Sequence, residues 1–329
     1  MLIQPCSALT IRPRQKTPPV FGAATASEGV LLIGHGSQCV MSAREMLAVG
    51  AHVGELRPDL AVEVGFLEMT DPPAGVALDR LVARGATNIT VLPLMLLAAG
   101  HAKSDAPAIV LEGRMRYPEV TFHFGRPFGV DHTLVQIASD NIAAAGGTGL
   151  PLVVIARGTS DPDANGDAFK ATRLLTEFTG APFGITGFSG ITMPRVPEAL
   201  EMASKLGADR VCVFAWFLCN GKLVERMRAD YVEFTDRTGI SVVDAGYFGP
   251  DPRLAPVIGA RLDEARRGAV TMSCDTCSYR LPFPGLLDRV GQAVGVGHSH
   301  LAEEHRHSGS VHSHSHSHTH DHIHAHNHG

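Results

Sequence analysis

The fold is decided by the stretch Gly29-Val30-Leu31-Leu32-Ile33-Gly34-His35-Gly36-Ser37. Its run of consecutive apolar residues, bounded by glycines, is typical of a short strand buried on both faces of a parallel sheet. Amphipathic segments with helical spacing alternate with further apolar runs downstream. The expected strands are residues 30–33, 62–66, 89–97 and 120–124, and the expected helices are 43–56, a segment ending near 82, 104–116 and 133–145. This alternation predicts an α/β fold in which helices flank a small parallel sheet.

The same pattern begins again in the second half of the chain. The apolar run 152–156 ends in Arg157-Gly158-Thr159-Ser160, which lies 122 residues after His35-Gly36-Ser37-Gln38. Apolar runs at 183–189 and 211–218 continue the repeat, and residues 249–254 resemble 129–134. Several matches in one order at a nearly constant offset predict an internal duplication. The alternative is a pair of unrelated α/β domains, because βα patterns look alike.

The distribution of histidine separates a globular body from a tail. The chain has 18 histidines, and 13 of them fall between His298 and the C-terminus. There they alternate with small polar residues, which leaves no apolar set to bury, so we expect disorder. The expected parts are an N-terminal extension (1–28), a half carrying the metal site (29–147), a degenerate half (148–268), a C-x-x-C segment (269–297) and the His-rich tail (298–329).

Composition excludes several classes of function. The net charge is −5, and no basic stripe with interleaved aromatic residues suggests a nucleic-acid partner. No apolar run approaches the roughly 20 residues that span a bilayer, and residues 1–28 lack the apolar core of a signal peptide. We therefore expect a cytoplasmic protein without a membrane partner. In that reducing compartment its six cysteines would be free or bind metal.

Three polar residues follow three successive strands of the first half. His35 follows the first expected strand, Glu68 the second and His101 the third. Loops at the carboxyl ends of parallel strands line one crevice, so these side chains can converge. Two imidazoles and one carboxylate suit a borderline divalent metal, and a histidine that releases metal is also a base near neutral pH. The alternatives are a bystander role for each histidine and a helix cap for Glu68.

The second half lacks this ligand set. Arg157 stands at the place of His35, Gly190 at that of Glu68 and Lys222 at that of His101. Arginine binds carboxylates through paired hydrogen bonds and lysine acts as a point charge. Arg157 and Lys222 could thus hold a polyanionic substrate above the metal site, with Gly36 and Ser37 beside His35 as further substrate contacts. The alternative for Arg157 is a surface ion pair.

Several motifs resemble the class II chelatases that act on sirohydrochlorin, over about residues 29–265. They are residues 31–37, Phe66-Leu67-Glu68, 93–97 with Gly100-His101, Asp105-Ala106-Pro107, and residues 157–165, which look like the second-half motif of the long form. The resemblance implies two similar α/β halves that face each other across a cleft and insert Co²⁺ or Fe²⁺ without ATP. It identifies His35 and His101 as catalytic and Glu68 as the metal-site carboxylate.

The resemblance makes the expected activity that of a sirohydrochlorin cobaltochelatase, a lyase of cobalamin biosynthesis that releases two protons. No G-x-x-x-x-G-K-[ST] phosphate loop is present, in agreement with a reaction without ATP. Ligand type cannot separate Co²⁺ from Fe²⁺ or Ni²⁺. One alternative is a ferrochelatase of sirohaem synthesis, and another is a protein that stores or delivers metal without catalysis. A chain with both halves can form its cleft as a monomer, and a dimer is left open.

Two features lie outside the halves. Cys274 and Cys277 form a C-x-x-C that resembles an iron–sulfur segment of some long-form relatives, although such a cluster usually needs four thiolates. Cys212, Cys219 or another chain would have to supply the rest. Another metal or redox role and incidental cysteines are the alternatives. The His-rich tail is expected to collect Co²⁺, Ni²⁺ or similar ions, unless it is an appended purification tag.

Overall fold

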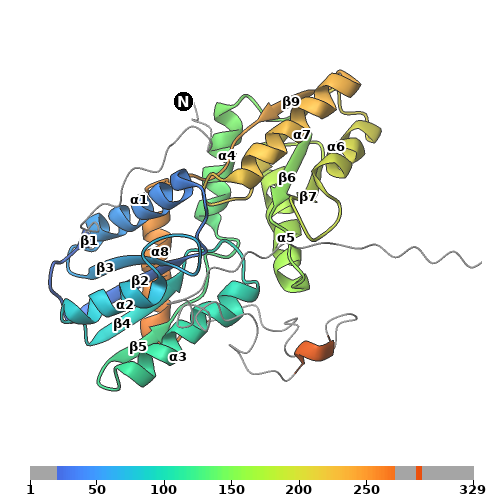
Figure 1. Ribbon diagram of the computed structural model, residues 1–329. Coiled ribbons are helices and arrows are strands. Elements are labelled where there is room, and N and C mark those ends of the chain that lie inside the picture. The colour runs from blue at the N-terminus through green and yellow to red at the C-terminus, as the bar shows by residue number, and fades with distance from the viewer. Residues whose placement is uncertain (1–20, 271–286, 291–329) are drawn as a thin grey trace, which may run out of the picture.

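The computed structural model describes residues 21–270 and 287–290 (Figure 1). The first half is built on a five-stranded sheet with the order β1-β3-β2-β4-β5. All neighbouring pairs are parallel except that β1 runs antiparallel to β3. Its strands are β1 (Phe21–Gly22), β2 (Glu28–Gly34), β3 (Ala61–Phe66), β4 (Asn88–Pro93) and β5 (Thr121–Phe124). Its helices are α1 (Val40–Leu56), α2 (Ala74–Ala83), the π-helix η2 (His101–Asp105), α3 (Ala106–Arg116) and α4 (His132–Ala144).

The second half repeats this plan with a parallel four-stranded sheet of order β7-β6-β8-β9. Its strands are β6 (Leu152–Ala156), β7 (Gly184–Phe188), β8 (Arg210–Ala215) and β9 (Ser241–Asp244). Its helices are α5 (Pro162–Thr179), α6 (Val196–Lys205), α7 (Lys222–Thr238) and α8 (Leu254–Arg266), and a short 3₁₀ turn, η3, covers Leu287–Arg289. The order matches β3-β2-β4-β5, so the expected α/β class with two similar halves is confirmed.

The loops after the first and second strands of each half are alike in detail. The Thr70 hydroxyl accepts from the Ser37 amide at 2.9 Å and donates to the Ser37 carbonyl at 2.9 Å. Thr192 makes the same two bonds to Thr159, at 3.2 and 2.9 Å. Two non-glycine residues have a left-handed backbone, Met69 (φ 55°) and Ile191 (φ 62°), and they occupy equivalent positions. Such repeated loop geometry indicates duplication rather than two unrelated domains.

The last helix of each half covers the sheet of the other half. Figure 1 shows α8 behind the first sheet, where it contacts α1 and β4, while α4 lies against α5 in the second half. Residues of α4 and α8 join both sheets in one apolar core, in which Leu134 of α4 and Leu254 of α8 are fully buried. The opposite faces of the sheets are covered by α2 and α3 in the first half and by α6 and α7 in the second. The exchanged helices therefore tie the two halves together.

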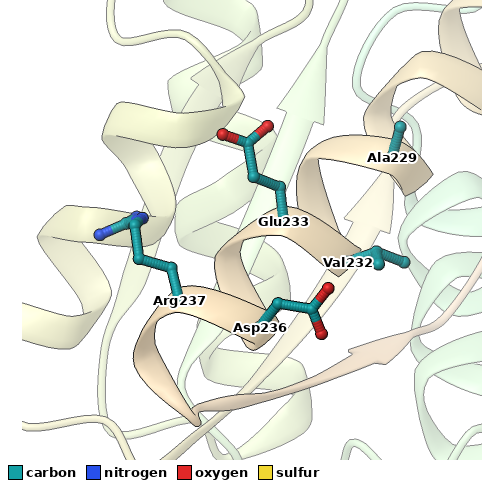
Figure 2. Close-up of a pocket in the computed structure, with 5 residues that line it drawn as sticks. All are labelled: Ala229, Val232, Glu233, Asp236 and Arg237. Carbon is teal, nitrogen blue, oxygen red and sulfur yellow. The ribbon is translucent and has the colours of Figure 1, made fainter.

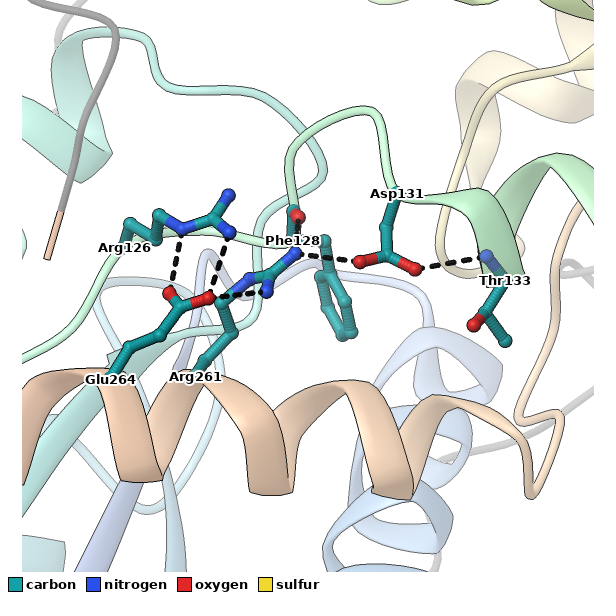
Figure 3. Close-up of polar contacts among 6 residues, drawn as sticks. All are labelled: Arg126, Phe128, Asp131, Thr133, Arg261 and Glu264. Carbon is teal, nitrogen blue, oxygen red and sulfur yellow. Dashed lines mark hydrogen bonds and ion pairs between the residues drawn. The ribbon is translucent and has the colours of Figure 1, made fainter. Parts of the chain in front are cut away.

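A polar network fixes α8 on the first half (Figure 3). The buried Arg261 guanidinium donates to the Phe128 carbonyl at 2.7 Å and to Asp131 at 2.9 Å. Glu264 accepts from Arg261 and, through both carboxylate oxygens, from Arg126 at 2.8 and 3.0 Å. Because Asp131 also caps α4 by accepting from the Thr133 amide, one carboxylate links the two exchanged helices.

Two strands are shorter than their apolar runs predict. β4 ends at Pro93 and β8 at Ala215, whereas the sequence suggested 89–97 and 211–218. After β4 the Leu94 amide still bonds the Ile33 carbonyl, and the chain then turns while Leu94 and Leu96 stay buried. The apolar residues beyond Pro93 therefore belong to a buried loop and not to a continuation of the strand. Within the described residues, no helix is both long and apolar enough to cross a bilayer.

Candidate functional site

A cavity of about 620 Å³ lies between the two halves. Its first-half wall includes His35, Gly36, Ser37 and His101, and its second-half wall includes Arg157 and Lys222. Apolar residues from both halves complete it, among them Met46, Met69, Met95, Leu96, Leu97, Phe188, Trp216, Phe217 and Leu218. Its volume and its few convergent polar groups are those of a small-molecule site.

His35 and His101 meet at one wall of this cavity. Their Nε2 atoms lie 3.1 Å apart, and the ring planes are nearly perpendicular, with centroids 4.4 Å apart. Both side chains remain 40% exposed, so a ligand in the cavity can reach them. The strand-end placement of these residues therefore brings them together as expected.

The Nδ1 atom of each imidazole faces oxygen acceptors. His101 Nδ1 lies 2.6 Å from Asp105 Oδ2, and His35 Nδ1 lies 3.0 Å from the Gly36 carbonyl and 3.4 Å from Glu68 Oε1. Acceptors of this kind hold the proton on Nδ1, which leaves the lone pair of a neutral ring on Nε2. With both protons held in this way, the two Nε2 lone pairs converge on one point. When no metal is bound, one additional proton between the two Nε2 atoms can form a hydrogen bond that uses both lone pairs.

This convergence is what a metal ion requires of two imidazoles. With metal–nitrogen distances of about 2.1 Å, the observed separation of 3.1 Å corresponds to an N–metal–N angle of roughly 95°. Glu68 Oε1 lies near the other nitrogen of His35, where it can orient the ring from behind, and a direct bond from Glu68 to the metal stays a prediction. Among the residues that the structure describes, no three His, Cys, Asp or Glu side chains are arranged to hold a metal ion. The two histidines thus offer two ligands, and the remaining coordination positions of a bound metal ion would face the cavity.

The pKa of His35 is lowered, chiefly because burial removes water from the imidazolium. The Gly36 carbonyl and Glu68 oppose this shift, whereas His101 and Arg157 add to it through their positive charge. The neutral ring, which alone can bind a metal or accept a proton, is therefore favoured at this site.

The local backbone explains why these residues reach the cavity. His35 directly follows β2, and Gly36 (φ 95°) turns the chain so closely over β3 that an added Cβ would lie 1.7 Å from the Glu68 carbonyl oxygen. His101 opens the π-helix η2, and a π-helical turn at a functional residue is a recurrent arrangement. Asp105 ends the same turn, which places its carboxylate beside His101.

Buried polar contacts hold the second half against this wall. Lys103, 7% exposed, pairs with Asp161 at 2.8 Å and with Asp163 at 3.1 Å at the start of α5. Burial alone would lower the pKa of Lys103, but the two carboxylates outweigh it and raise that pKa. Glu45 of α1 accepts from the Asn220 amide and from the Tyr247 hydroxyl, both at 2.7 Å. The two walls of the cavity are therefore fixed relative to each other.

Comparison with known proteins decides the family. The CbiX family model matches residues 29–145 and again residues 151–265, one match for each half. The chain belongs to the CbiX family. The two matches confirm the resemblance to class II sirohydrochlorin chelatases and coincide with the two repeats.

Individual relatives agree with this membership in the CbiX family. The chain is 36% identical to a sirohydrochlorin cobaltochelatase of Priestia megaterium, over 80% of this chain and 87% of that protein. It is 28% identical to a sirohydrochlorin ferrochelatase of Bacillus subtilis, over 62% of this chain and 78% of that protein. The crystal structure of the sirohydrochlorin chelatase SirB from Bacillus subtilis subspecies spizizenii in complex with cobalt matches with a TM-score of 0.65 and 25% identity, over 74% of this chain and 96% of that one.

The two cationic residues predicted for substrate binding both line the cavity of this CbiX protein. Lys222 donates to Gln38 Oε1 at 2.7 Å across the two halves. Arg157 makes no ion pair within the described residues, which argues against the alternative of a surface ion pair. Its pKa is lowered by burial and by the charges of Arg226 and Arg195.

Asp105 is the functional residue that sequence reasoning missed. Its signal was available, because a carboxylate four residues after a histidine lies on the same face of a helix. In the sequence, Asp105 enters only through the motif Asp105-Ala106-Pro107 that carries the family resemblance.

The described cysteines agree only in part with the expectation of free or metal-binding thiols, because two are free and one is not. Cys39, beside the His35 loop, is disulfide-bonded. Cys212 and Cys219 are free and buried, and burial raises the pKa of Cys212 to about 12, so this thiol is a poor metal ligand. Cys274, Cys277 and the His-rich tail lie outside the described residues.

A second hollow, of about 720 Å³, lies along α7 (Figure 2). Ala229, Val232, Glu233, Asp236 and Arg237 line it. Figure 2 shows the Asp236 and Glu233 carboxylates pointing apart, and Arg237 is paired with Glu201. None of the predicted site residues lies there, so the cavity between the halves is the candidate site.

Proposed function

We propose that this chain inserts Co²⁺ into sirohydrochlorin without ATP, as a sirohydrochlorin cobaltochelatase (a lyase) of cobalamin biosynthesis. The observation that carries the proposal is the convergence of the His35 and His101 Nε2 atoms at the wall of a cavity between two halves. The cobaltochelatase relative at 36% identity and the cobalt complex of SirB support the choice of substrate and metal.

Metal insertion replaces two pyrrole protons of the macrocycle by one divalent cation. In the proposed reaction His35 and His101 first hold Co²⁺ through Nε2. As the ion passes to the pyrrole nitrogens, each Nε2 lone pair is freed and can accept a departing proton. The two protons then leave to solvent through the exposed edges of the rings. Asp105 and Glu68 keep each Nδ1–H in place throughout, so that Nε2 stays the reactive atom.

The same geometry would serve Fe²⁺, which makes a ferrochelatase of sirohaem synthesis the second candidate. Imidazole nitrogen binds Co²⁺, Fe²⁺ and Ni²⁺ alike, with modest differences in affinity. Which metal is bound in a cell depends largely on which metal ion is available. A ferrochelatase of Bacillus subtilis is among the relatives, although at 28% identity. The higher identity to the cobaltochelatase favours cobalt.

A direct assay tests the proposal. Sirohydrochlorin is mixed anaerobically with the full chain and Co²⁺, and the absorbance change of metal insertion is followed without nucleotide. We expect turnover above the spontaneous rate with Co²⁺ and slower turnover with Fe²⁺ or Ni²⁺. The same rate with and without protein would overturn the proposal, and faster insertion of Fe²⁺ would favour the ferrochelatase.

Deletion of residues 298–329 separates catalysis from metal storage. We propose that the tail supplies metal and takes no part in insertion, so the truncated chain should keep full turnover at saturating Co²⁺. A storage protein would instead lose its function with the tail. Whether Cys274 and Cys277 hold an iron–sulfur cluster, and whether the chain is a monomer or a dimer in the cytoplasm, stay predictions from the sequence.

A further inference from the structure

The second half carries a counterpart of the metal site in which the charges are inverted. Arg157 occupies the position of His35, and Gly190 occupies that of Glu68. Arg226 follows Lys222 by four residues along α7, as Asp105 follows His101. The two histidines of the first half are thus replaced by Arg157 and Lys222. Its two carboxylates are replaced by Gly190 and Arg226.

A fifth position extends this pattern. Pro73 bridges to Phe66 in the first half, and Arg195 makes the equivalent bridge to Phe188 in the second. The residue at this point of the first half has no charge, whereas its counterpart is a guanidinium at the start of α6. The change again adds positive charge to the second half.

The three arginines converge on the loop that follows β7. Arg226 donates to the Ser189 carbonyl at 2.7 Å, and the Ser189 hydroxyl donates to the Arg157 carbonyl at 3.2 Å. A Cβ added at Gly190 would lie 2.5 Å from Arg157 Nη1, so the guanidinium lies directly over this glycine. Arg195 bridges to Phe188, the last residue of β7, so its backbone lies beside the same loop, and the charges of Arg195 and Arg226 both lower the pKa of Arg157.

Among the residues that the structure describes, no carboxylate forms an ion pair with Arg157, Arg195 or Arg226. Arg195 Nε is buried there without a hydrogen-bond partner. Asp230 is the carboxylate on α7 that interacts with the charge of Arg226, yet it makes no ion pair with it. A carboxylate at position 190, as in the first half, would have neutralised Arg157. Positive charges gathered in this way repel one another unless an anion joins them, and partial burial further disfavours the charged form of Arg157.

We propose that Arg157, Arg195 and Arg226 form a carboxylate-binding subsite that holds peripheral acid groups of the macrocycle, opposite the metal-binding histidines. Arg157 lines the cavity and connects it to the other two arginines. Planar guanidinium groups bind carboxylates through paired hydrogen bonds, which fixes orientation as well as position. Duplication has thus produced one half that holds the cation and one that holds the anion. The inference rests on the proposed function for the identity of the macrocycle.

Fluorescence of Trp216 can measure this binding apart from catalysis. It is the only tryptophan of the chain and lines the cavity, so a bound tetrapyrrole should quench its emission. Metal-free sirohydrochlorin is titrated into the full chain and into Arg157→Gln, Arg195→Gln and Arg226→Gln. We expect each substitution to weaken binding about tenfold or more, because a charge-assisted hydrogen bond is lost. Affinity for Co²⁺ alone should not fall, because a positive charge is removed, and added salt should weaken sirohydrochlorin binding most in the wild type.

Two further variants make the result decisive. Arg173→Gln removes an arginine of α5 that is 75% exposed and should bind sirohydrochlorin as wild type does. Arg195→Lys keeps the positive charge but lacks the planar guanidinium group. It should recover part of the affinity for sirohydrochlorin, which would show that the loss in Arg195→Gln comes from the missing charge and not from misfolding. Wild-type affinity in the three Gln variants, or no quenching in the wild type, would overturn the subsite. Arginine-dependent binding without metal insertion would uphold the subsite and refute the proposed function.

Discussion

His101 Nδ1 and Asp105 Oδ2 lie 2.6 Å apart on one turn of helix, and this contact determines which nitrogen of His101 faces the cavity. A carboxylate that accepts from Nδ1–H leaves Nε2 free as the metal ligand and raises its basicity. Asp105 is 9% exposed, so water competes little for the contact. In the proposed function, Asp105 therefore acts on the metal through His101, as a positioning residue.

Asp105→Asn tests this role. The amide keeps the shape of the side chain but can present its NH₂ group to Nδ1, which would move the imidazole proton to Nε2. We expect Co²⁺ affinity, measured by titration, to fall about 10- to 100-fold. Glu119→Gln, an exposed change on the same half, is the control and should bind Co²⁺ normally. Equal affinity of Asp105→Asn and wild type would refute the positioning role.

The pH dependence of stability should show the lowered pKa of His35. Burial favours the neutral ring, so the unfolded chain binds this proton more tightly than the folded one. The stabilisation is present above 6.5, the ordinary pKa of a histidine, and is lost as pH falls through the lower pKa of His35 in the folded protein. Urea unfolding at about pH 7.5 and about pH 5.5 should show a larger acid loss in wild type than in His35→Gln. The same acid loss in both proteins would contradict the shift.

Lys103→Met should destabilise the protein strongly. The substitution leaves Asp161, which is fully buried, and Asp163 without their cation, at an expected cost of about 3–5 kcal/mol. Lys222→Met is the matched control, because its exposed contact with Gln38 also crosses the two halves, and it should cost less than about 0.5 kcal/mol. Chemical denaturation measures both. Similar losses in the two variants would show that the buried pair does not hold the halves together.

Gly36→Ala should disrupt the His35 loop. The backbone is left-handed there, and the new methyl group would overlap the Glu68 carbonyl oxygen, so the loop has to move. We expect a loss of stability well above the roughly 1 kcal/mol of an ordinary left-handed Gly→Ala change, together with weaker Co²⁺ binding. Gly100→Ala precedes the other histidine and has nothing within 4 Å of its added Cβ, so it should be tolerated. Normal Co²⁺ binding by Gly36→Ala would rule out the tight turn as the cause of His35 placement.

Residues that follow strands were predictable, and contacts between halves were not. Runs such as 30–33 and 152–156 are long enough to indicate buried parallel strands. This placed His35 and His101 at the carboxyl edge of one sheet, and Arg157 and Lys222 at that of the other. No local pattern reveals that α4 and α8 exchange sheets, because each helix has an apolar face that either sheet could cover. The pairing of Lys103 with Asp161, 58 residues away, likewise depends on the tertiary fold.

The central claim is that the convergent Nε2 atoms of His35 and His101 carry out metal insertion, and the Co²⁺ insertion rate of single and double alanine variants tests it most directly. His35→Ala and His101→Ala should each abolish most of the turnover with sirohydrochlorin, and the double variant should be little worse, because both residues serve one ion. His52→Ala, which removes a histidine of α1 outside the cavity, should keep wild-type turnover. Wild-type insertion of Co²⁺ by both single variants would contradict the claim.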